Sequence, residues 1–168
     1  GIRLVLLDVD GVLTDGRLIF DGAGRDLKSF HIRDGQGIKL LQSGGVRVGI
    51  LSGRSSKAAE ARCRELGMDM IHTGVKDKYT AFRRILENEK LSPEEVCYMG
   101  DDLVDIPVLS RVGLALAVAD SIPEVKGVAH FVTRLGGGAG AVREASEKIL
   151  KSQGKWNALV CSFLASAS

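Results

Sequence analysis

The chain has 168 residues, of which 45% are hydrophobic and 26% charged, a balance that fits one globular domain with a full core. The net charge of +2 gives no strong field for nucleic acid or a membrane surface, and no apolar run reaches the length of a membrane span. Cys63, Cys97 and Cys161 are unclustered, which argues against a disulfide framework and favours a cytoplasmic location.

Short apolar runs alternate with helical patterns along the chain. The expected strands are residues 3–9, 46–51, 69–72, 96–99, 114–118 and 129–133, and the expected helices lie near 35–43, 55–66, 78–89, 103–111 and 139–152. This alternation predicts an α/β fold with a doubly wound, mainly parallel, Rossmann-like sheet and helices on both faces. We expect a single domain at residues 1–153, followed by a C-terminal tail at 154–168.

Two segments depart from this alternation. Residues 17–20 and 27–32 flank the turn sequence Asp-Gly-Ala-Gly, which predicts a β-hairpin inserted at 17–32. The gaps between the polar motifs described below leave no room for a large cap domain. The tail is apolar from residue 156 onward and has no strong cap or turn signal, so it either docks on its own subunit, is partly disordered, or packs onto a neighbour.

A pair of acids follows the first apolar run. Residues 4–7 are apolar, and Asp8 and Asp10 come directly after them. A buried strand that ends here places both carboxylates at the carboxyl edge of the sheet, where open α/β folds bind ligands. Such carboxylates can share a metal or a proton, or one can be a nucleophile while the other handles protons. An acidic turn is the alternative for this segment alone.

Three further segments place polar groups at strand ends or helix starts. Residues 52–53 (Ser-Gly) can hold a phosphate, although a serine here is also an ordinary helix N-cap. A lysine before the helix at 78–89, Lys76 or Lys78, can neutralise a phosphate, although alone it is typical of a solvated charge. The acids at 101–105 are oxygen ligands that suit Mg²⁺. Because parallel strands end at one edge, the segments together predict one site.

Taken in order, these segments resemble the haloacid dehalogenase superfamily of phosphatases. The residues that carry the resemblance are Asp8-Val9-Asp10-Gly11-Val12-Leu13-Thr14, Ser52-Gly53-Arg54, Lys78 and Gly100-Asp101-Asp102. Residues 30–35, 100–105, 117–120 and 133–144 also resemble a narrower family, the 3-deoxy-D-manno-octulosonate 8-phosphate phosphatases. The resemblance to this family covers residues 3–150.

The resemblance implies catalytic roles for five residues. Asp8 is the implied nucleophile, which forms an aspartyl-phosphate, and Asp10 is the implied acid and base. Ser52 and the N–H of Gly53 are implied to bind phosphoryl oxygens, and Lys78 to neutralise charge at Asp8. Thr14 could fix the acidic loop or serve as a plain turn residue.

The resemblance also implies a magnesium site. Its ligands are the side chains of Asp8 and Asp101 and the backbone carbonyl of Asp10. Asp102 or Asp105 is implied to lie behind these ligands and to orient waters of the metal or Lys78.

The implied reaction converts 3-deoxy-D-manno-octulosonate 8-phosphate to the free sugar acid and phosphate, a step of lipopolysaccharide sugar biosynthesis. The arginines that could meet the substrate carboxylate are Arg33, Arg54, Arg134 and Arg143. Arg54 is our first choice, because it directly follows the Ser-Gly pair implied to bind phosphate. Related enzymes for nine-carbon sugar acids prefer glutamate at that place, so Arg54 favours the eight-carbon substrate. The family also implies a homotetramer whose hairpins close shared sites.

Several alternatives remain open at this stage. The chain could be a phosphatase for a nine-carbon sugar-acid 9-phosphate, or a non-catalytic regulatory domain that assembles tetramers. A signalling receiver domain is disfavoured, because its phosphate acceptor ends the third strand and has no acid two residues later. The glycine-rich loop at 136–140 could approach the substrate or cap the following helix.

Overall fold

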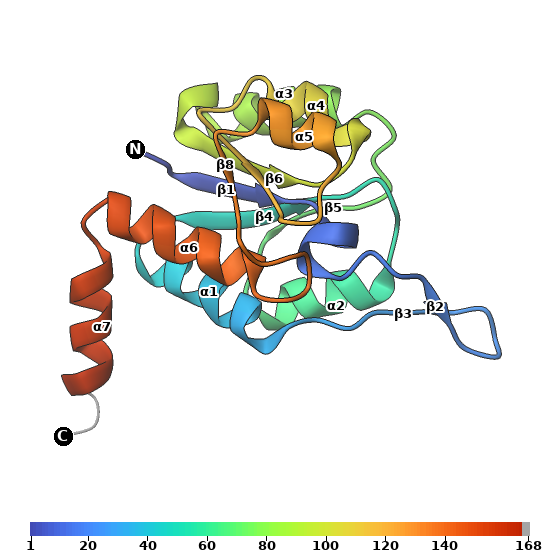
Figure 1. Ribbon diagram of the computed structural model, residues 1–168, viewed down its shortest axis with the longest axis horizontal. Coiled ribbons are helices and arrows are strands. Elements are labelled where there is room, and N and C mark those ends of the chain that lie inside the picture. Colours follow the sequence, from blue (N-terminus) through green and yellow to red (C-terminus); the bar gives the residue numbers. More distant parts are fainter. Residues whose placement is uncertain (166–168) are drawn as a thin grey trace.

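A computed structural model describes residues 1–165 of the protein. Its centre is a parallel sheet with the strand order β5-β4-β1-β6-β7-β8 (Figure 1). The strands are β1 (Leu4–Leu7), β4 (Arg47–Leu51), β5 (Met70–His72), β6 (Val96–Gly100), β7 (Leu114–Ala117) and β8 (Phe131–Val132). The predicted α/β class and parallel sheet are therefore confirmed. Each expected strand is present: β6 extends one residue further than expected, to Gly100, and the other strands are shorter than expected.

Helices cover both faces of the sheet, as predicted (Figure 1). One face carries α1 (Ile32–Ser43), α2 (Lys57–Glu65) and α6 (Ala141–Ser152), and the other carries α3 (Lys78–Glu89), α4 (Ile106–Leu109) and α5 (Pro123–Val128). Successive residues of a strand point to opposite faces, so Val5 and Leu7 pack in one core while Leu4 and Leu6 pack in the other. This double burial explains why β1 is apolar throughout.

Some expected elements differ from the structure. The hairpin has only short strands, β2 (Ile19–Phe20) and β3 (Asp26–Leu27), and the residue expected to end its second strand, Ile32, begins α1 instead. The helix expected at 103–111 is divided into a 3-10 turn, η3 (Leu103–Asp105), and α4. Pro107 lies at the start of α4, where its missing N–H costs no helical hydrogen bond. The sequence reading missed α5, η2 (Pro93–Glu95) and the π-helical turn η1 (Val9–Leu13).

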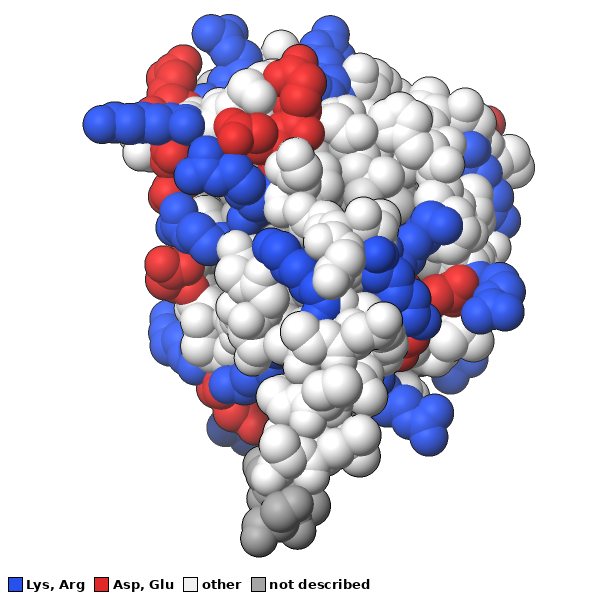
Figure 2. Space-filling view, turned by 90° about the vertical axis from the view of Figure 1, so that its left-hand side faces the viewer, with Lys and Arg blue, Asp and Glu red and all other residues white. Residues whose placement is uncertain are grey.

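The C-terminal tail forms a further helix, α7 (Trp156–Ala165). Trp156 and Leu159 pack against the core beside α6, whereas Phe163 and Leu164 are exposed. The helix contains no charged residue and projects from the body of the molecule as an uncharged surface (Figure 2). The last three residues of the expected tail lie outside the described residues. Within residues 1–165, no helix is long and apolar enough to cross a membrane.

Candidate active site

The acidic loop begins where β1 ends. Asp8 is buried, and its N–H donates to the carbonyl of Met99 on the neighbouring β6 at 3.0 Å. Gly11 has a φ of +90°, and a Cβ added there would lie 2.1 Å from Oδ2 of Asp101. Glycine at this position therefore permits both the turn and the close approach of the second acidic segment. The hydroxyl of Thr14 accepts the N–H of Gly16 at 3.2 Å, which supports its role in fixing the loop.

Lys78 lies at the centre of the buried charges. Its Nζ is 2.9 Å from Oδ1 of Asp8 and 2.7 Å from Oδ1 of Asp105. Burial tends to lower the pKa of Lys78, but the two carboxylates outweigh it, so that its pKa is raised and the ammonium stays charged. Lys76, the other lysine considered from the sequence, is exposed. The register of α3 therefore settles which lysine meets the acids.

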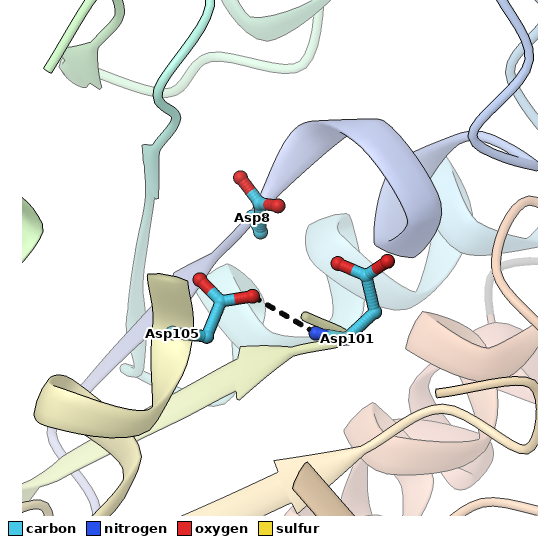
Figure 3. A group of neighbouring side chains, drawn as sticks. All are labelled: Asp8, Asp101 and Asp105. Atoms are coloured by element: carbon cyan, nitrogen blue, oxygen red, sulfur yellow. Dashed lines mark hydrogen bonds between the residues drawn. The ribbon is translucent and has the colours of Figure 1, made fainter. Parts of the chain in front are cut away.

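Asp105 holds this arrangement together from behind. It is fully buried, and its Oδ1 accepts from Lys78 and from the hydroxyl of Tyr98 at 2.6 Å. Its Oδ2 accepts the backbone N–H of Asp101 at 2.9 Å (Figure 3). The same oxygen accepts the backbone N–H of Asp102 at 3.2 Å. Both oxygens are thus occupied by hydrogen bonds, which fix the loop after β6 in place. This contact of Tyr98 could not be predicted, because a tyrosine within an apolar strand is typical of a core residue.

The acids form a site that suits a divalent cation. Carboxylate oxygens of Asp8, Asp101 and Asp105 lie within 4.8 Å of one another, and Figure 3 shows them around a common space. Burial, followed by the charge of Asp8, raises the pKa of Asp101 to about 7, and burial raises the pKa of Asp8 to about 6. Carboxylates held together at such a cost suit a bound cation. Because both oxygens of Asp105 already accept hydrogen bonds, Asp8 and Asp101 are the side chains of this group that could hold Mg²⁺.

The second expected acid, Asp10, is partly buried, and its carboxylate lies between two cations. Nζ of Lys28 forms an ion pair with its Oδ1, and Nε of Arg54 is 3.6 Å from its Oδ2. Arg54 reaches it from the segment after β4, which also contains the buried Ser52 and the exposed Gly53. The sequence analysis missed Lys28, because a lysine beside a hairpin normally points into solvent.

The other three arginines lie elsewhere. Arg33, Arg134 and Arg143 line an open cavity of about 1060 Å³ that extends along α6 beside the start of α1. The cavity lining includes none of the acids of the site. Nε of Arg134 is 3.3 Å from Glu144, and Nε of Arg143 is 2.8 Å from Glu147. Within residues 1–165, Arg54 is the one of the four that pairs with Asp10.

The glycine-rich loop supports the acidic loop. The N–H of Gly138 donates to the carbonyl of Val12 at 3.0 Å, and a Cβ added at Gly137 would lie 1.8 Å from the carbonyl oxygen of Gly11. The same loop leads into α6, where Asp34 accepts the N–H of Arg143 at 2.8 Å. The loop therefore packs against η1 and leads directly into the first residue of α6.

Comparisons with known proteins agree with this geometry. Residues 68–140 match the model of the haloacid dehalogenase-like hydrolases. The 3-deoxy-D-manno-octulosonate 8-phosphate phosphatase of Escherichia coli is 46% identical over 154 residues, which are 92% of this chain and 82% of the relative.

Solved structures of the same family also share the fold. The enzyme of that name from Yersinia pestis has a TM-score of 0.91 at 44% identity and covers 93% of this chain and 84% of its own. The one from Moraxella catarrhalis, solved with magnesium, phosphate and KDO, has a TM-score of 0.94 at 35% identity, and the match covers 96% of this chain and 93% of that chain. This chain therefore belongs to the family of the 3-deoxy-D-manno-octulosonate 8-phosphate phosphatases, within the haloacid dehalogenase-like hydrolases.

Proposed function

We propose that this protein is a Mg²⁺-dependent phosphatase that hydrolyses 3-deoxy-D-manno-octulosonate 8-phosphate through a phosphorylated Asp8. The observation that carries the proposal is the buried Asp8, paired with Lys78 at 2.9 Å and facing Asp101 across a space that suits a cation. A scaffold has no use for buried charges that repel one another, so the arrangement disfavours a non-catalytic regulatory domain.

In the first half of the reaction, an oxygen of Asp8 attacks phosphorus and the bond from phosphorus to the sugar oxygen breaks. Lys78 fixes the attacking carboxylate and offsets charge on the phosphoryl group. The leaving sugar oxygen takes the proton of the Asp10 carboxyl group, so the free sugar departs as an alcohol. Ser52 and the N–H of Gly53 hold the phosphoryl oxygens at the end of β4.

In the second half, a water molecule attacks the phosphorus of the aspartyl-phosphate. Asp10, now a carboxylate, takes the proton of that water, and the bond between phosphorus and Asp8 breaks. Inorganic phosphate leaves and both acids return to their starting states. Asp10 suits this exchange because it is two residues from the nucleophile and its side chain keeps contact with solvent, at 19% exposed.

The metal would be held by Asp8 and Asp101, with the backbone carbonyl of Asp10. When bound, Mg²⁺ screens the repulsion between the Asp8 carboxylate and the anionic phosphate, which otherwise opposes attack. Asp105 would act behind the ligands by orienting Lys78 and the backbone of Asp101. Asp102, which is exposed and caps η3, would have a lesser part in the site.

The sugar-acid class of the substrate is supported by the relatives, whose names specify the eight-carbon acid, and by Arg54 beside the acids. Arg54 would contact the substrate carboxylate. Arg33, Arg134 and Arg143, which lie around a different cavity, would contribute only if that cavity joins the site in an assembly.

We further propose a homotetramer in the cytoplasm. The hairpin exposes Ile19, Phe20 and Leu27 to about half of their area, as expected of a surface that another subunit covers. In the described part of the chain all three cysteines are free, which suits a reducing compartment.

The test is a substrate panel with Mg²⁺ present. We expect phosphate release from 3-deoxy-D-manno-octulosonate 8-phosphate with a kcat/KM far above that for a nine-carbon sugar-acid 9-phosphate or an aryl phosphate. A preference for the nine-carbon ester would transfer the function to that substrate, and no release from any ester would overturn the enzymatic proposal.

A further inference from the structure

The side chain of Lys28 is buried although its surroundings in the chain are exposed. It follows β3 directly, beside hairpin residues such as Leu27 that are half exposed, yet its own side chain is only 2% exposed. Burying an ammonium is costly unless it is paired, so a lysine in this position is held by specific partners. Its principal partner is Oδ1 of Asp10.

The two oxygens of Asp10 are held unequally. Lys28 occupies Oδ1 with a buried ammonium, whereas Nε of Arg54 lies 3.6 Å from Oδ2 on a side chain that is 48% exposed. An exposed pair at this distance contributes little to fixing a side chain, because solvent screens it. Lys28 is therefore the group that sets the rotamer of Asp10.

Asp26 holds Lys28 from its other side. Asp26 and Lys28 are two residues apart in extended chain and face the same way, and Oδ2 of Asp26 is 3.8 Å from Nζ of Lys28. This oxygen is buried and has no hydrogen-bond partner within residues 1–165. The ammonium of Lys28 thus lies between two carboxylates and contacts that of Asp10 more closely. When the Asp10 carboxyl group turns toward a leaving oxygen, the carboxylate of Asp26 can still pair with the ammonium.

We infer that Lys28 is a positioning residue for Asp10, through which the β2–β3 hairpin aligns the acid and base of the reaction. The inference rests on the proposed function, because it assumes that Asp10 exchanges a proton with the substrate oxygen. The inference predicts an effect that depends on the leaving group. The rate of phosphoryl transfer from a sugar phosphate depends on the placement of Asp10, because the sugar oxygen leaves only with a proton. The rate for an aryl phosphate hardly depends on it, because the aryl oxygen leaves unprotonated.

The test compares kcat/KM for an alkyl sugar phosphate and an aryl phosphate, because this constant reports the steps up to release of the alcohol. We expect Lys28→Met to lower the value for the sugar phosphate by about 100-fold, the cost of a misplaced catalytic group. The value for the aryl phosphate should change by less than about threefold, a small shift in barrier. Lys28→Arg should recover much of the loss, and Lys126→Met, at an exposed site on α5, should match the wild type.

Two further readouts separate the possible outcomes. Binding of inorganic phosphate should be unchanged in Lys28→Met, and an equal loss on both esters or weaker phosphate binding would overturn the inference by making Lys28 a general structural or binding residue. Asp10→Asn is the reference for the proposed function. If it shows the leaving-group selectivity and Lys28→Met does not, the inference alone fails; if neither shows it, the role of Asp10 fails as well.

Discussion

Replacing Asp105 with asparagine tests whether the buried network behind the nucleophile holds the site together. The change keeps the volume and removes one charge. Lys78, Tyr98 and two backbone N–H groups donate to this carboxylate, and an amide offers one accepting oxygen and a donating NH₂ in its place. Whichever way the amide turns, its NH₂ faces donors that the carboxylate had satisfied.

Two effects oppose each other in this variant. Removing the charge relieves its repulsion with Asp8, since Asp105 contributes to the raised pKa of Asp8. Against this, the buried ammonium of Lys78 loses one of its carboxylates, and breaking a buried pair costs about 3–5 kcal/mol. The lost pair and hydrogen bonds outweigh the relieved repulsion, so we expect Asp105→Asn to lower the free energy of unfolding by about 3 kcal/mol.

The assay is urea unfolding of the metal-free protein, together with its melting temperature. For a domain of this size about 3 kcal/mol corresponds to a fall of about 10 °C. Asp69→Asn is the matched control, because Asp69 is highly exposed and lies 3.6 Å from Arg47, so its loss should change stability by less than about 0.5 kcal/mol. A decrease in the free energy of unfolding that is no larger for Asp105→Asn than for Asp69→Asn would refute the reasoning.

Three further predictions follow from the same geometry. Asp8→Asn should abolish turnover while leaving the circular dichroism spectrum unchanged; turnover near the wild-type rate would remove Asp8 as the nucleophile. Because the pKa of Asp8 is raised to about 6 and that of Asp101 to about 7, the folded metal-free protein binds protons more tightly than the unfolded chain. This contribution to the stability of the metal-free protein is present below about pH 4 and lost by about pH 7. The rise in melting temperature caused by Mg²⁺ should therefore become larger from pH 4 to pH 7. A rise that is the same at every pH would contradict the raised pKa values of the two acids. Gly137→Ala should lower kcat/KM by at least about tenfold, because its methyl group would lie 1.8 Å from the carbonyl oxygen of Gly11 and displace the acidic loop. Gly127→Ala is the control and should have no effect, because its methyl group would meet open space. Equal activities of the two variants would contradict this prediction.

The elements that local sequence fixes were predicted well. Apolar strands and their neighbouring helices follow from periodicity, and the polar segments at strand ends follow from where parallel sheets bind ligands. The structure accordingly brings Asp8, Asp101 and Lys78 together, as the sequence analysis expected. The metal and catalytic roles of these residues remain predictions.

The parts that depend on contacts distant in sequence were not predictable in the same way. Lys28 reaches Asp10 across the hairpin, and Tyr98 reaches Asp105 from within a core strand, so neither contact follows from the residues beside them. The ion pair of Arg143 with Glu147 could have been predicted from the sequence, because residues at i and i+4 of a helix lie on the same face. The tail helix α7 lacks the capping residues that normally mark a helix start.

The most direct test of the account is to trap the phosphoryl group on Asp8. In Asp10→Asn, an aryl phosphate should still phosphorylate the protein, because its leaving group needs no proton, while hydrolysis of the intermediate stalls for lack of a base. We predict release of the aryl alcohol in a burst equal to the concentration of sites, and recovery of phosphate by mass spectrometry on the peptide that contains Asp8. Steady turnover without a burst, or phosphate on any other residue, would contradict the account.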